Sequence, residues 1–233
     1  MCKRDIRNTI VAIMAIATTT LASAGNSIRE LWIAMPDTAT VYLDSLTKRD
    51  MLYYYDNGVG IVASNIFGDS TSIDTITDGY MCVSMSKAMQ MQLRVFTKTD
   101  STQVMCMVRT YKSDDGLAAN DSDMMADVVG GESDVAFFDS EWRQLDDMYG
   151  LPLCLDEDSL LSQLTFLPDT MTQKRYAELR SMIDPVMLLA TLSADTETIT
   201  LTLATPMLRR DEREDVKTII MSREFKWNGS MFK

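Results

Sequence analysis

Histidine is absent from this chain of 233 residues. Its absence excludes Ser-His-Asp and Cys-His nucleophilic catalysis, imidazole acid–base chemistry and every metal site that needs a histidine ligand. Carboxylates are then the side chains left for general acid–base catalysis. They form no recognisable catalytic motif. We therefore predict no catalytic residue and no cofactor, and we favour a non-enzyme while leaving that question open.

Basic side chains are also scarce: 22 Lys and Arg stand against 34 Asp and Glu, which gives a formal net charge of -12. A nucleic-acid-binding protein needs a surplus of basic side chains to displace counterions, so we expect no nucleic-acid partner. Glycine and proline are few, at 10 and 5 residues, and 46% of the chain is hydrophobic. This composition excludes a disordered or collagen-like chain and predicts an ordinary globular core.

The first 24 residues have the three parts of a secretory signal peptide. A basic start is followed by an apolar stretch over residues 9–21, and Ala22-Ser23-Ala24 precedes Gly25. The apolar stretch is shorter than the roughly 20 residues that a membrane-spanning helix needs. We predict cleavage after Ala24, and a buried N-terminal helix is the alternative.

The positions of the cysteines bear on where the mature chain resides. A bacterial lipoprotein needs a cysteine directly after the apolar stretch, whereas the nearby Cys2 lies ahead of it. We therefore expect no lipid anchor, no transmembrane span in the mature chain, and a periplasmic or cell-surface location. The mature chain keeps Cys82, Cys106 and Cys154, so an oxidising compartment leaves at least one thiol unpaired or paired between chains.

Hydrophobic periodicity predicts an α+β fold in which an antiparallel β meander carries several short helices. We expect residues 25–233 to form a single domain, with a possible weak lobe seam near residue 150. The predicted helices begin after Ser27, Thr47 and Thr170 and at Arg209. The predicted strands cover residues 80–85, 89–95, 103–111, 135–138 and 198–203, and a type I′ hairpin turn at Asn228-Gly229 ends the chain.

Sulfur-bearing side chains gather in the predicted meander. Thioether and thiolate sulfur suits Cu(I), which makes five of them candidate metal ligands: Cys82, Met85, Met89, Met91 and Cys106. Methionine is also an adaptable filler of cores, and the chain contains 19 of them, so core packing is the favoured interpretation. A Cys82–Cys106 disulfide is not expected, because an intervening strand would separate the two residues by roughly 10 Å.

Residues 113–132 are polar and acidic, and we predict an exposed loop whose role stays open. Four of its acids follow the ligand spacing of an EF-hand: Asp121, Asp123, Asp127 and Glu132. Met125 and Ala126 stand where that motif requires a ligand and a glycine. We therefore favour a solvated loop over a calcium site.

Two further groups of side chains are candidates for binding or catalysis. Acids cluster at Asp156-Glu157-Asp158 and at Asp146-Asp147, and paired carboxylates can hydrolyse glycosidic bonds. Neighbours in sequence do not face each other across a cleft, which argues against such a pair. Tyr53-Tyr54-Tyr55 cannot all point inward from one helix, so an exposed ring there, or Trp142, is a candidate surface for stacking on a sugar or partner.

Several stretches resemble an uncharacterised family of exported Bacteroidales proteins of unknown function. They are Glu30-Leu31-Trp32 with Met35-Pro36-Asp37, Leu46 with Arg49-Asp50-Met51, Asp78-Gly79-Tyr80, residues 100–106, Asp139-Ser140-Glu141-Trp142, Thr205-Pro206 and Trp227-Asn228-Gly229. The resemblance spans nearly the whole mature chain and implies a bacterial envelope setting, but it carries no site residues. It also makes Thr38, Ser45 and Thr170, each of which follows an aspartate, candidate sites of O-glycosylation.

These observations predict an exported, non-catalytic protein that binds a protein or glycan partner in the cell envelope. A carboxylate-dependent glycan hydrolase and a Cu(I)-binding protein are the alternatives.

Overall fold

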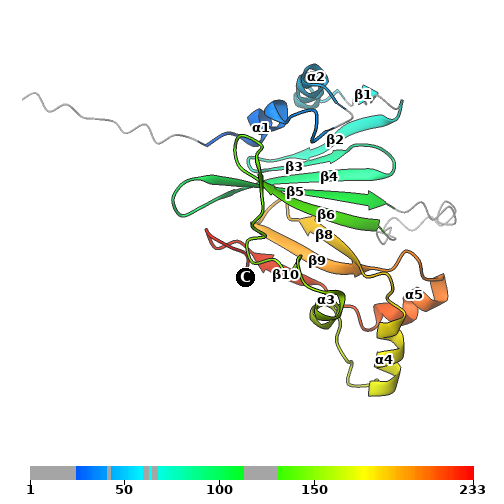
Figure 1. The fold of residues 1–233 in the computed structure, drawn as a ribbon. Helices are drawn as coiled ribbons and strands as arrows, with labels where there is room; N and C mark the ends of the chain where they lie inside the picture. The colour runs from blue at the N-terminus through cyan, green and yellow to red at the C-terminus, as the bar shows by residue number, and fades with distance from the viewer. Residues whose placement is uncertain (1–24, 41–42, 60–62, 65–67, 113–130) are drawn as a thin grey trace, which may run out of the picture.

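The protein forms three layers, with a large antiparallel sheet in the middle (Figure 1). The computed structural model describes residues 25–40, 43–59, 63–64, 68–112 and 131–233. Two short helices, α1 (Ile28–Ala34) and α2 (Ser45–Asp56), cover one face of the large sheet. A smaller sheet and the remaining helices pack on the other face. The predicted α+β class with an antiparallel meander is thereby confirmed.

The large sheet runs in simple chain order from β1 to β7. Its strands are β1 (Ala63–Ser64), β2 (Ser70–Ile76), β3 (Tyr80–Ser84), β4 (Met89–Thr97), β5 (Gln103–Lys112), β6 (Gly131–Phe138) and β7 (Gln144–Leu145). β5 pairs with β4 on one side and β6 on the other, as its apolar character on both faces predicts. β1, β2 and β7 were not predicted from the sequence, because they are short or rich in Ser and Thr.

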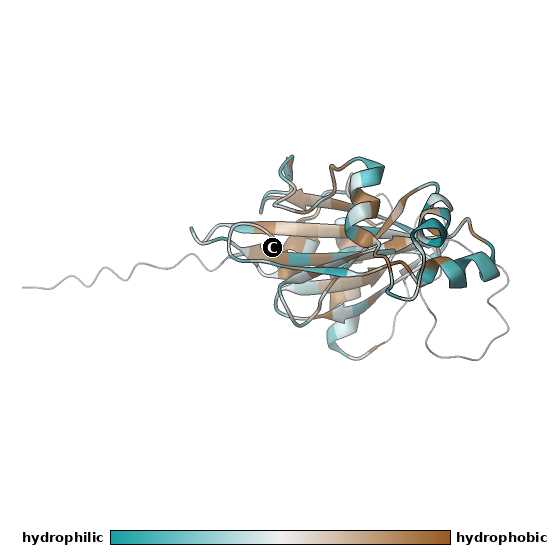
Figure 2. Cartoon of the chain, turned by 90° about the horizontal axis from the view of Figure 1, so that it is seen from below, coloured by the Kyte–Doolittle hydropathy of each residue, from teal (hydrophilic) through white to brown (hydrophobic). Residues whose placement is uncertain are grey.

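The smaller sheet has the strand order β10-β9-β8. Its strands are β8 (Met187–Leu192), β9 (Thr198–Ala204) and β10 (Arg223–Lys226), and the helices beside it are α3 (Glu157–Leu164), α4 (Gln173–Ser181) and α5 (Arg210–Lys217). Residues from both sides of position 150, such as Phe137 and Leu201, contribute to the core between the two sheets. In Figure 2 the hydrophobic colour is concentrated on the strands, while the helices carry long hydrophilic stretches.

Local capping explains where the helices begin. Ser27 and Glu30 form the predicted capping box of α1. The predicted caps Thr47 and Thr170 were wrong: Asp44 caps α2 and Thr172 caps α4, each by accepting a hydrogen bond from the backbone N–H three residues later. Aspartate is the stronger N-cap, so α2 begins earlier than the apolar spacing alone indicated.

Two predicted loops also differ from the structure. At the C-terminal turn, Trp227 pairs with Phe232 across four residues, which is too long for the predicted type I′ turn. Residues 113–130 of the predicted acidic loop, with Asp121, Asp123 and Asp127, lie outside the described residues, as does the predicted signal peptide. Gly131 and Glu132 belong to β6, where a Cβ on Gly131 would lie 2.1 Å from the carbonyl oxygen of Tyr111.

The large sheet separates two hydrophobic cores. The methionine core lies between this sheet and the α1–α2 layer, and it contains eight buried methionines: Met35, Met51, Met81, Met85, Met89, Met91, Met105 and Met107. The inter-sheet core lies between the two sheets and is built from aromatic and branched side chains such as Phe96, Phe137 and Trp227.

Candidate functional site

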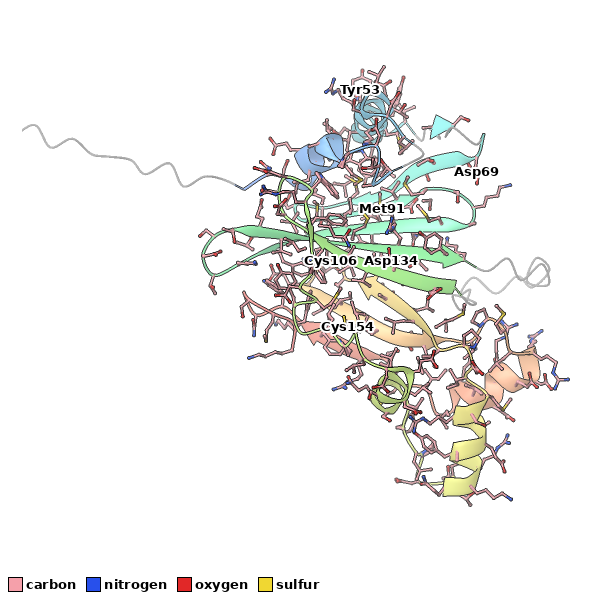
Figure 3. The ribbon with its side chains drawn as sticks, viewed as in Figure 1. Tyr53, Asp69, Met91, Cys106, Asp134 and Cys154 are labelled. Carbon is pink, nitrogen blue, oxygen red and sulfur yellow. The ribbon has the colours of Figure 1, made fainter. Side chains whose placement is uncertain are left out.

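The structure places the candidate sulfur ligands on opposite faces of the large sheet. Met85, Met89 and Met91 belong to the methionine core, whereas Cys82 and Cys106 belong to the inter-sheet core. Strand side chains alternate between faces, so residues an odd number of positions apart along one strand cannot meet. Figure 3 shows Met91 toward the α1–α2 layer and Cys106 toward the smaller sheet. The five candidates therefore do not form one mixed thiolate–thioether site.

Both buried cysteines are free thiols, and β4 lies between their strands, so the expected absence of a disulfide between them is confirmed. Burial, and to a smaller extent the nearby carboxylate of Asp74, raise the pKa of Cys82 to about 11. Burial also raises the pKa of Cys106. Because the thiolate is the nucleophile and metal ligand, neither cysteine is prepared for such chemistry at neutral pH.

An acidic groove lies between the start of α3 and the end of α4. Its volume is about 600 Å³, and it is open to solvent. It is lined by Asp156, Glu157 and Asp158 from α3, Arg180 and Ser181 from α4, and Asp184 and Val186 from the segment that leads into β8, among others. One of the predicted acid clusters therefore lines this groove, whereas Arg180 and Asp184 were not identified from the sequence.

Two of the acids in the groove, Asp156 and Asp158, are held by ordinary structural contacts. Asp156 caps α3, accepting hydrogen bonds from the backbone N–H of Ser159 at 2.9 Å and from its hydroxyl at 2.8 Å. The backbone hydrogen bond is the main cause of the lowered pKa of Asp156. Arg180 donates to the carbonyl oxygen of Asp158 at 2.8 Å and lies 3.5 Å from its carboxylate. A general acid needs a raised pKa, so Asp156 is shifted in the wrong direction for that role.

The remaining predicted candidates lie elsewhere. Asp147 accepts a hydrogen bond from the backbone N–H of Tyr149 at 2.7 Å and so shapes a turn. Trp142 is buried, and its indole N–H donates to the carbonyl oxygen of Leu31 at 3.0 Å. It is therefore a core residue, and its ring is not exposed for stacking on a ligand. Tyr53 is the exposed ring of its tyrosine run, with 65% of its surface accessible (Figure 3).

One buried lysine was not identified from the sequence. Lys48 is fully buried, and its ammonium group donates to the carbonyl oxygen of Met35 and lies 3.5 Å from the carboxylate of Asp37. Burial lowers its pKa. The signal was available, since Lys48 precedes the buried Met51 and Leu52 by three and four residues and so shares their helix face.

Comparisons with known proteins place the chain in a family. A family model described as "Protein of unknown function (DUF3256)" matches residues 20–232. The chain belongs to the DUF3256 family. Among solved structures it is similar to a domain of an uncharacterised protein from Porphyromonas gingivalis W83, with a TM-score of 0.62 and 16% identity over 88% of this chain and 96% of that one. At this identity the likeness shows a shared fold.

The predicted resemblance to an uncharacterised family is thus confirmed, and the similar solved structure comes from a species of the Bacteroidales. The curated proteins contain no significant match to this DUF3256 chain. Within its described residues, none of the helices combines the length and apolar character needed to cross a membrane. In the same part of the chain, no three His, Cys, Asp or Glu side chains gather closely enough to hold a metal ion.

Proposed function

We propose that this DUF3256 protein is an exported, non-catalytic binding protein of the cell envelope and that it contacts its partner through the acidic groove. The three-part leader over residues 1–24 supports export. The groove supports binding, because its volume of about 600 Å³ falls within the roughly 300–1,000 Å³ of ordinary ligand pockets.

The charge of the groove defines the chemistry of the partner. Four carboxylates line it against the single guanidinium of Arg180. The lowered pKa of Asp156 keeps that carboxyl ionised at neutral pH. An excess of fixed negative charge attracts cations and repels acidic surfaces. We therefore favour a protein partner that presents a lysine- or arginine-rich segment. The excess of carboxylates in the groove is the observation that carries this proposal.

The test removes negative charges from the groove and keeps the N-terminal cap of α3. A Glu157→Gln/Asp184→Asn double variant removes two groove charges and leaves Asp156 in place as the cap of α3. Glu224→Gln, on the exposed edge of β10, is the matched control. Binding of a fluorescent lysine-rich decapeptide, and of its glutamate counterpart, is measured by anisotropy at two salt concentrations.

The lysine-rich peptide should bind the wild-type protein and the control, while the glutamate peptide should not. Two exposed ion pairs at about 0.2–1 kcal/mol each predict roughly 2- to 30-fold weaker binding by the double variant. Equal binding of both peptides, or no effect of the double variant, would contradict the proposal. Native material whose N-terminus is Met1 instead of Gly25 would contradict export.

The groove also bears on the alternative of a carboxylate-dependent glycan hydrolase, because it brings Asp184 close to an acid cluster distant in sequence. Incubation with a panel of glycan oligomers decides between the two functions. We expect no cleavage. Cleavage that is abolished by Glu157→Gln or Asp184→Asn would replace the binding proposal with hydrolysis.

A further inference from the structure

Three methionines lie together where β3 turns into β4, at one end of two inner strands of the large sheet. Met85 directly follows β3 and faces Met89 at the start of β4, and the backbone N–H of Met85 donates to the carbonyl oxygen of Met89 at 2.9 Å. Met91 lies two residues further along β4 and points to the same face. Facing Cβ atoms on antiparallel strands are about 4.5–5.5 Å apart, and the step along a strand to the next side chain on that face is about 6.8 Å. Flexible methionine side chains span such distances, so the three thioether sulfurs can turn toward one point.

The surroundings of these thioethers favour a soft ion. Met91 is paired across the sheet with Arg109, but the guanidinium of Arg109 forms an ion pair with Asp134, so its charge is compensated. Val83 and Trp32 are apolar neighbours in the methionine core, and Thr71 is a polar one, whose hydroxyl donates to the carbonyl oxygen of Met85 at 2.8 Å. Among the described residues, no three His, Cys, Asp or Glu side chains gather there to select a harder cation. Thioether sulfur is a ligand class that Cu(I) prefers.

This end of the two strands lies next to solvent. The turn between β3 and β4 ends with Lys87 and Ala88, both exposed. Met89, the next residue, keeps 7% of its surface accessible, whereas Met85 and Met91 are fully buried. Of the three methionines, Met89 is thus the one nearest to solvent, at the end of the sheet where β3 turns into β4.

We propose that Met85, Met89 and Met91 form a three-thioether site for Cu(I). The two buried cysteines take no part, since they lie on the opposite face of the sheet. This site is separate from the acidic groove and does not depend on the proposed function.

The chain provides a matched control for the experiment. Met81 and Met107 occupy the same core, but Leu93 lies between them on β4, so their strands are roughly 10 Å apart. The test variant is Met85→Leu/Met89→Leu/Met91→Leu, and the control variant is Met81→Leu/Met107→Leu. Leucine conserves the volume of methionine, and a melting curve for each variant verifies that it folds. All samples carry Cys2→Ser and Cys154→Ser, so that no terminal or exposed thiol competes for the metal.

Two readouts identify the site. With ¹³C-methyl-labelled methionine, one equivalent of Ag(I), a redox-stable substitute for Cu(I), should shift the NMR signals of three methionine methyl groups. Under anaerobic conditions, Cu(I) affinity measured by competition with bicinchoninate should fall at least tenfold in the test variant and stay unchanged in the control variant. No methyl shift, shifts that persist in the test variant, or equal losses of affinity in both variants would each overturn the proposal.

Discussion

Lys48 offers the sharpest test of how this fold is held together. Its side chain is fully buried, its ammonium group donates to the carbonyl oxygen at the end of α1, and its ion-pair partner Asp37 has a side chain that is 72% exposed. The position therefore combines an apolar stem that fills space, a hydrogen bond to a backbone carbonyl and a buried charge. Substitutions can separate these three contributions.

The expected effects differ in size and sign. Lys48→Met keeps the volume and removes the buried charge, but it leaves the carbonyl of Met35 without this donor at a cost of about 1–3 kcal/mol. Relief from burying the ammonium opposes that cost, as the lowered pKa of Lys48 indicates. We expect a net change within about 1 kcal/mol. Lys48→Ala also removes three methylenes and leaves a cavity, so it should be less stable than Lys48→Met by about 3 kcal/mol.

Urea unfolding followed by tryptophan fluorescence measures these differences. Trp32 reports on the region, since its indole N–H donates to the backbone carbonyl of Lys48 at 3.1 Å. Asp37→Asn is the control, and its effect should stay below about 1 kcal/mol because the carboxylate is exposed. Equal stability of the Ala and Met variants would refute the packing argument. A large loss in Asp37→Asn would show that the ion pair, and not the stem, carries the stability.

Three further predictions follow from local geometry. In the native protein, Cys154 should react with a thiol reagent within minutes. Cys82 and Cys106 should react only after unfolding, because they are buried and their pKa values are raised. If more than one of these three thiols reacted in the native protein, the prediction would be wrong. The capping carboxyls of Asp44 and Asp156 have lowered pKa values, so their contribution to stability is present above their ordinary pKa and is lost as the pH falls through the folded-state value. In the Asp44→Asn variant, the melting temperature should therefore decrease less steeply as the pH falls from about 5 to 2. An equally steep decrease in the variant and the wild-type protein would contradict a stabilising role of the Asp44 carboxylate. Gly131→Ala should destabilise by more than about 2 kcal/mol because its Cβ would meet the Tyr111 carbonyl, whereas Gly79→Ala, whose Cβ has 3.8 Å of clearance, should change the melting temperature little.

Local patterns were enough to predict much of the sheet. The alternation of Met89, Met91 and Leu93 with polar residues predicted that these three side chains share the buried face of β4. The apolar run of β5 predicted a central strand. β8 was missed because its apolar run lacks alternation, and α3 because its short sequence fits a helix or a loop equally well. Because side chains alternate between the two faces of a strand, Cys82 and Met85, which are three positions apart, are expected on opposite faces. The separation of the sulfur ligands could therefore have been predicted from the sequence.

The acidic groove, in contrast, could not be read from the sequence. Asp156 and Asp184 are 28 positions apart, and they line one groove only because α3 and α4 pack beside the smaller sheet. The burial of Lys48 likewise depends on α1 and α2 lying against each other and on the sheet.

The sequence by itself therefore determined the class of fold, the order of the meander and the family, because these rest on periodicity and on residues close together in the chain. The tertiary structure alone decided which distant carboxylates share a groove and which charge is buried. Those outcomes depend on how helices and sheets pack across long sequence separations, and no local pattern encodes that packing.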